Sequence, residues 1–196
     1  MEPSLPPTAR RSRRSFLWAV GGAAVGLTSS VLYKQWRATR LGLTGQPMPP
    51  LASGGTWLNT DRPLTPDNLR GNVVFMQFSF IGCGPCRMMM PYLARWHAEF
   101  GPRGLVVIEI DDGKSDSLDD VHDWIAREKV AFPVLHDTAG AVCQQFGIAT
   151  FPSMYLFGRD GNCVWEGGGW GGDERTAVIE RRIEQTLAET MAKAAT

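Results

Sequence analysis

Cysteine is scarce in this chain of 196 residues, which holds four, at positions 83, 86, 143 and 163. So few thiols at such uneven spacing exclude a disulfide scaffold of the kind that stabilises small secreted domains, and they leave one close pair. The sequence shows no internal repeat, which argues against a solenoid. Its length and its 43% of hydrophobic residues suit one ordinary domain plus an appendage.

Net charge is also absent, because 20 basic residues balance 20 acidic ones. The first 40 residues hold seven basic residues and one acidic residue, which leaves 13 basic and 19 acidic residues in the remainder. An acidic body without a basic stripe interleaved with aromatic residues argues against binding to nucleic acid. The basic leader points instead to membrane targeting.

The leader has the order of an export signal, with a basic segment before a weakly apolar stretch at 18–32. The string Ser-Arg-Arg-Ser-Phe-Leu at 12–17, with its pair Arg13 and Arg14, resembles the twin-arginine signal family. Residues 1–40 are therefore predicted to be a cleaved signal or a retained membrane anchor; the alternative is a basic tail before a short buried helix. Residues 41–55, rich in glycine and proline, are predicted to be a linker, and 56–196 the folded domain.

In the body of the chain, short β-rich runs alternate with segments of helical periodicity, which is typical of an α/β fold with parallel strands. Strands are predicted at 73–80, 105–111, 134–135, 153–157 and 163–165. Helices are predicted at 85–100, 117–129, 139–146 and from 173 onward. The glycine-rich turn at 158–162 indicates a hairpin between the last two strands.

The motif that carries chemistry is Gly82-Cys83-Gly84-Pro85-Cys86, between a predicted buried strand and an amphipathic helix. Free N–H groups and the dipole at a helix N-terminus favour a thiolate, which lowers the pKa of the first cysteine. Proline suits the first helical turn because it has no N–H to lose. Two intervening residues allow the sulfurs to close a disulfide.

The Cys-Gly-Pro-Cys-Arg-Met segment at 83–88 and the proline at 91 resemble the thioredoxin pattern of redox cysteines and kink-forming proline. The tripeptide 150–152, Thr-Phe-Pro, stands just before a predicted strand, where that family places its cis-proline. Segments 57–71 and 132–137 look like the TlpA-like exported branch. The resemblance to the thioredoxin superfamily covers about 50–190 and implies a thioredoxin-like fold, a central mixed β-sheet flanked by helices on both faces.

The resemblance implies that Cys83 is the exposed nucleophile and Cys86 the buried resolving thiol. It implies substrate docking by four residues: Gly84, Pro85, Phe151 and Pro152. It implies no cofactor beyond the redox-active disulfide between the two cysteines. A metal site at this pair would need two further ligands, and no histidine stands at ligand spacing, so none is predicted.

Three positions depart from the family pattern. Gln77 stands where thioredoxin has a buried carboxylate, and glutamine cannot titrate. Met89 stands where some of the exported branch has another carboxylate, and Gly82 replaces the usual aromatic residue. Proton transfer must then use water or another acid; Glu109 on the neighbouring predicted strand is a candidate, with a solvent-facing side chain as the alternative.

Taken together, these features predict an exported thiol:disulfide oxidoreductase at the outer face of the cytoplasmic membrane, which exchanges disulfides with protein thiols. The Gly-Pro dipeptide favours a reductant, and the resemblance implies a membrane thiol-relay protein as electron donor. The alternatives are a thiol oxidase or peroxidase, or a copper-binding or delivery module that uses both cysteines and a histidine.

Other features have a structural and a functional interpretation. The methionines at 88–90 offer soft ligands for Cu(I), but consecutive helical residues point in different directions, so packing is favoured. The aspartates between 111 and 123 lack the spacing of a calcium loop and are interpreted as a solvated loop and an acid-rich helix start. Cys143 and Cys163 are interpreted as small buried residues, with a second disulfide as the alternative.

Overall fold

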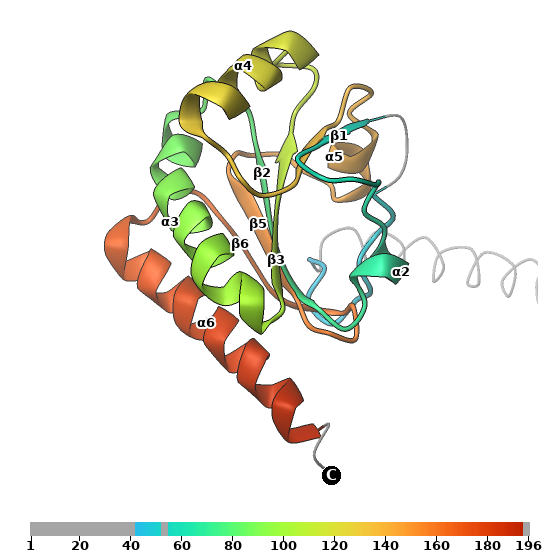
Figure 1. Cartoon of the computed structure of the whole chain (residues 1–196), viewed down its shortest axis with the longest axis vertical. Coiled ribbons are helices and arrows are strands. Elements are labelled where there is room, and N and C mark those ends of the chain that lie inside the picture. Colours follow the sequence, from blue (N-terminus) through green and yellow to red (C-terminus); the bar gives the residue numbers. More distant parts are fainter. Residues whose placement is uncertain (1–41, 52–54, 194–196) are drawn as a thin grey trace, which may run out of the picture. The chain divides into compact units, whose positions relative to one another are not determined.

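The computed structural model describes residues 42–51 and 55–193, with side chains described to residue 189 (Figure 1). At its centre is a sheet of six strands in the order β1-β4-β3-β2-β5-β6. The strands are β1 (Thr56–Leu58), β2 (Val73–Ser79), β3 (Leu105–Asp111), β4 (Val134–His136), β5 (Ser153–Phe157) and β6 (Cys163–Gly168). β2, β3 and β4 run parallel, whereas β1, β5 and β6 are antiparallel to their neighbours. The sheet is therefore mixed, as expected.

Helices cover both faces of this sheet (Figure 1). They are α2 (Pro66–Leu69), α3 (Gly84–Phe100), α4 (Leu118–Glu128), α5 (Ala141–Gln145) and α6 (Gly172–Lys193). The odd-numbered apolar residues of β2 and β3 form one core with α3, α4 and α6. The even-numbered residues form a second core with α2 and α5. The two cores follow from the alternation of side chains along a strand.

Five of the six strands, β2 to β6, and the helix α3 form where the sequence predicted them. Every residue of β2 is buried, which suits a central strand covered on both faces. On α3, Met89, Leu93, Trp96 and Phe100 recur every three or four residues and are all buried. The edge of the Trp96 ring meets the Phe75 ring at a centroid distance of 5.2 Å, so the helix is fixed against the centre of β2.

The short elements β1 and α2 were not delimited from the sequence. A strand of three residues and a helix of four are too short to show a period. The helix α2 depends on its cap: the Thr65 hydroxyl accepts the Asn68 amide, and the Asn68 side chain accepts the Thr65 amide.

The predicted linker, 41–55, is docked against the domain over its described part. The Gly45 amide donates to the Cys163 carbonyl at 2.7 Å, and the Met48 amide donates to the Gly161 carbonyl at 2.9 Å. Met48 and Leu51 are buried in the second core. These contacts place 43–51 within the folded unit, because the segment hydrogen-bonds along the β5–β6 hairpin.

The predicted signal or anchor, 1–40, lies outside the described residues. Among the helices of the described part, none is both long enough and apolar enough to cross a membrane. The export prediction therefore stays a prediction.

Candidate active site

Cys83 and Cys86 are joined by a disulfide at the N-terminus of α3, with their Cα atoms 5.2 Å apart. Cys83 is the N-cap residue of this helix, and its sulfur accepts the Cys86 backbone amide at 3.2 Å. The Cys86 N–H, at the helix N-terminus, thus donates to the sulfur of Cys83. This contact stabilises a thiolate at Cys83 when the disulfide is reduced.

Both cysteines are buried in this oxidised form. Cys83 is 5% exposed and Cys86 is 2% exposed, whereas Gly82, Gly84 and Pro85 around them are exposed. The expectation of an exposed Cys83 is therefore wrong for the disulfide state, because its sulfur is turned inward over the Cys86 amide.

The Phe151–Pro152 peptide bond is cis, as the resemblance implied. It directly precedes β5, which pairs with β2 so that Ser153 lies opposite Phe78. This register brings the loop after β2 next to the proline loop, and the Phe80 and Phe151 rings meet edge-on at 5.5 Å. The Pro152 carbonyl accepts the Gly169 amide at 2.8 Å, so the glycine-rich loop after β6 holds the proline loop from its other side.

Beneath the disulfide, polar side chains occupy the carboxyl ends of three parallel strands. Gln77 of β2 is paired in register with Glu109 of β3. One pleat further on, Ser79 is paired with Asp111, and Asp111 with His136 of β4. All five residues are buried. They lie on the sheet face that packs against α3, because odd positions of β2 and β3 face that helix.

Glu109 is 1% exposed, so its interpretation as a solvent-facing residue is wrong. Its Oε1 atom accepts hydrogen bonds from the Ser79 hydroxyl and, at 3.4 Å, from the Gln77 amide. Its Oε2 atom is buried and has no hydrogen-bond partner in the structure. Burial outweighs the two donors and raises the pKa of Glu109 from 4.5 to about 8.

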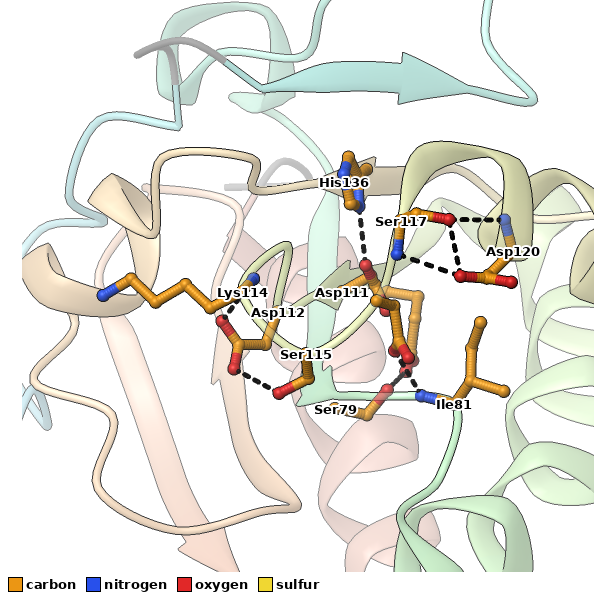
Figure 2. Close-up of polar contacts among 11 residues, drawn as sticks. Ser79, Ile81, Asp111, Asp112, Lys114, Ser115, Ser117, Asp120 and His136 are labelled. Carbon is orange, nitrogen blue, oxygen red and sulfur yellow. Dashed lines mark hydrogen bonds and ion pairs between the residues drawn. The ribbon is translucent and has the colours of Figure 1, made fainter.

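Asp111 is 3% exposed, so the interpretation of a solvated acidic loop is wrong for this residue. Its Oδ1 atom lies 2.7 Å from His136 Nδ1 (Figure 2). Burial, a hydrogen bond with Asp116 and the negative charges nearby raise the pKa of Asp111 to about 9. Asp116 is half-buried, and its Oδ2 atom accepts the Ile81 amide at 2.6 Å.

A narrow cavity joins the resolving cysteine to this polar layer. Its lining includes Cys86 and Arg87 of α3, Glu109 and Asp111 of β3, and Trp124 of α4. The volume open to the centre of a water molecule is about 10 Å³. That is about the space that one water needs, and the two carboxyl groups supply polar partners of the kind that a buried water requires.

A model of the AhpC/TSA family matches residues 45–166 of the chain. The chain belongs to the AhpC/TSA family. The thiol-disulfide oxidoreductase ResA of Bacillus subtilis (strain 168) is 29% identical over 97 residues, which are 50% of this chain and 53% of that protein. ResA of Oceanobacillus iheyensis is 30% identical over 95 residues, 48% of each chain. The chain thus spans about half the length of the curated relatives it matches.

Solved structures of similar fold cover more of the chain than the family model does. A thiol:disulfide interchange protein of the thioredoxin family from Chlorobium tepidum TLS superposes with a TM-score of 0.60 at 20% identity, over 72% of this chain and 97% of that one. One from a Bacteroides species gives 0.59 at 22% identity, over 73% and 91%. These likenesses show that the fold is thioredoxin-like.

Several residues of the buried polar layer at the ends of β2, β3 and β4 were not predicted from the sequence. Ser79, Asp111 and His136 are each the last residue of a parallel strand. That position was the available signal, since the carboxyl ends of neighbouring parallel strands meet at one edge of a sheet. Asp116 carries no such signal, because it lies in the loop between β3 and α4 and not at the end of a strand.

The remaining candidates play other parts. Met89 is buried in the core as expected, but Met88 is 55% exposed. Cys143 and Cys163 are both free thiols, and burial raises the pKa of Cys143 to about 12 and that of Cys163 to about 11. Asp120 forms a capping box with Ser117 at the start of α4, as an acid-rich helix start predicts. Within the described residues, no group of three metal-binding side chains comes together.

Proposed function

We propose that this chain is a thiol:disulfide oxidoreductase that exchanges disulfides with protein thiols through Cys83 and Cys86. The observation that carries the proposal is the Cys86 amide directed at the Cys83 sulfur at the N-terminus of a 17-residue helix. A thiolate stabilised in this way is both a nucleophile and a good leaving group. The names of the ResA relatives support the same activity.

The exchange proceeds in two displacements. The Cys83 thiolate attacks a client disulfide, which forms a mixed disulfide and releases the first client thiolate. The Cys86 thiol then loses its proton and attacks the Cys83 sulfur, which closes the Cys83–Cys86 bond and releases the second client thiolate. The client disulfide gains two electrons and the protein dithiol loses them.

The client segment docks against the exposed Gly84 and Pro85 on one side and against Phe151 and Pro152 on the other. The edge-on contact between Phe80 and Phe151 holds these two loops together. An extended client strand placed between them would bring its sulfur to Cys83, which has only 5% of its surface exposed.

Glu109 exchanges the proton of Cys86. Both residues line the same cavity, and Glu109 Oε2 has no other partner. Since the pKa of Glu109 is raised to about 8, the carboxyl group can carry a proton near neutral pH and donate it when the Cys83–Cys86 disulfide is reduced. In the resolving step the ionised form accepts the proton.

The reaction runs as a reduction of exported clients, with electrons from a membrane thiol-relay protein. The Gly-Pro dipeptide between the cysteines is that of thioredoxin, whose reduction potential is about −270 mV, whereas the strongest oxidants of the superfamily have potentials of about −120 mV. The basic leader with Arg13 and Arg14 directs the folded domain to the outer side of the cytoplasmic membrane.

The test is reduction of insulin by dithiothreitol, followed by turbidity, with catalytic amounts of the protein. The wild-type chain and a Cys143→Ser control should accelerate precipitation, and Cys83→Ser should not. Metal analysis of the reduced protein, purified without oxygen, distinguishes a redox enzyme from a copper-binding module. Bound copper without acceleration, or acceleration that survives in Cys83→Ser, would overturn the proposal.

A further inference from the structure

We propose that Asp111 and Asp116 form a proton-exit route that connects the cavity beside Cys86 to solvent. The inference rests on the proposed function and deepens it, because it concerns the step in which Cys86 resolves the mixed disulfide. Asp111 and Asp116 are positioning residues in this scheme: they pass on a proton that Cys86 releases and touch no client atom.

The need for a route follows from burial. Cys86 is 2% exposed, Glu109 is 1% exposed and Asp111 is 3% exposed, so none of these groups exchanges protons freely with bulk water. Gln77 on β2 cannot titrate, and the Ser79 hydroxyl already donates to Glu109. A proton taken up in the cavity therefore needs an exit for the next turnover.

Asp111 lies between the buried cavity and the more exposed β3–α4 loop. It lines the cavity together with Cys86, and the half-buried Asp116 lies near enough to raise its pKa. A proton that reaches Asp111 from the cavity can pass to the Asp116 carboxylate and then to solvent. His136 holds Asp111 in place through the contact at Oδ1, 2.7 Å from Nδ1.

The loop that carries Asp116 is fixed over the strand ends (Figure 2). The Asp112 amide donates to the Ser79 carbonyl at 2.8 Å, and the Asp112 carboxylate accepts the Ser115 hydroxyl at 3.0 Å. Asp116 in turn accepts the amide of Ile81, two residues before Cys83. The exit route is thus built from the β3–α4 loop and touches the active-site loop directly.

The ionisable groups around Asp111 come from each neighbouring element. Glu109 precedes it on β3, His136 faces it from β4, and Asp112 and Asp116 act on it from the following loop. Cys86 and Arg87 lie across the cavity on α3. Burial and the negative neighbours raise the pKa of Asp111, so its carboxyl group can hold a proton and pass it on.

The resolving step balances along this route. The Cys86 S–H bond breaks and its proton goes to the ionised Glu109 carboxylate, which passes it across the cavity to Asp111, and a proton leaves from Asp116 to solvent. The Cys86–Cys83 bond forms as the bond between Cys83 and the client sulfur breaks, and the client leaves as a thiolate. No further oxidant or reductant is needed, since the client disulfide accepts both electrons.

The test uses the reduced full chain and an aromatic disulfide whose released thiolate is coloured. The first phase of colour reports attack by Cys83, and the second reports resolution by Cys86. Asp116→Asn keeps an acceptor for the Ile81 amide and removes the ionisable group. We expect it to slow the second phase by about tenfold or more near neutral pH, with the first phase unchanged. Asp123→Asn, an exposed control on α4, should slow neither.

Small weak acids added to the buffer should restore the second phase in Asp116→Asn and leave the wild type unchanged, an effect that a purely structural role does not produce. Asp111→Asn should slow the same phase with weaker restoration, because its site is buried. A second phase of Asp116→Asn at the wild-type rate, or one that weak acids do not restore, would overturn the exit route. Absence of both phases in the wild type would instead contradict the proposed function.

Discussion

Replacing Glu109 with glutamine should make the stability of the fold less sensitive to pH. In the wild type the pKa of this carboxyl group rises from 4.5 to about 8 on folding, so the folded chain retains a proton that the unfolded chain has lost. Each pH unit in this window removes about 1.4 kcal/mol of stability. The full effect, from about pH 4.5 to about pH 8, is on the order of 5 kcal/mol.

The sign follows from which state binds more protons. The stability contributed by a raised carboxyl pKa is present below the unfolded value and is lost as the pH rises through the folded value. Glutamine keeps an oxygen to accept the Ser79 hydroxyl and the Gln77 amide but carries no charge. Glu109→Gln should therefore match the wild type near pH 5 and be the more stable protein near about pH 8. Asp111, whose pKa is also raised, keeps a residual slope in the variant.

The assay is urea unfolding of the oxidised protein, followed by tryptophan fluorescence at several pH values from about 5 to about 8. Glu184→Gln, exposed on α6, is the matched control and should run parallel to the wild type. If the curves of Glu109→Gln and the wild type stay parallel over this range, Glu109 is not a buried acid of raised pKa, and its assignment to proton transfer fails.

Three further outcomes are expected. Cys86→Ser should accumulate a mixed disulfide with its client and Cys83→Ser should not, as non-reducing electrophoresis and mass spectrometry will show; the opposite result would reverse the two roles. Lysine at both Arg13 and Arg14 should block export in a cell-fractionation assay, whereas full export would indicate the general secretory route. Gln77→Asp adds a second carboxyl group to the buried layer, so it should lower the stability of the fold in urea. It should also speed resolution of the mixed disulfide formed with a model disulfide, as measured by stopped flow. Resolution at the wild-type rate, with Cys83 equally reactive, would contradict this prediction.

The parts of the fold that the sequence predicted are those with a long or repeated signal. The apolar run of β2 indicates a buried strand, and the spacing of Leu93, Trp96 and Phe100 on α3 indicates a helix. The cysteine pair was found because its spacing and its place before a helix are both local. The docked segment at 43–51 was missed, because glycine and proline indicate a turn or linker whether or not the backbone then hydrogen-bonds to a hairpin.

The polar layer under the disulfide depends on register, which a single strand does not reveal. Glu109 follows four apolar residues of β3, and only its pairing with Gln77 brings it next to the position at which the resemblance to thioredoxin implies an acid. Asp111 was grouped with the aspartates after it because composition alone does not separate the last residue of a strand from the first of a loop. Burial separates them, since Asp111 is buried whereas Asp119 and Asp120 are exposed.

A carboxyl group on β3 has different neighbours from one on β2. At position 77 an acid would have Ser79 as its next neighbour on the same face, because side chains two apart share a face. At position 109 that neighbour is Asp111, which contacts His136 on the next strand and Asp116 in the β3–α4 loop. The strand that carries Glu109 is thus the one whose end leads to the half-buried carboxylate of Asp116. A glutamine at position 77 is consistent with this arrangement, since it donates to Glu109 without adding a second buried charge.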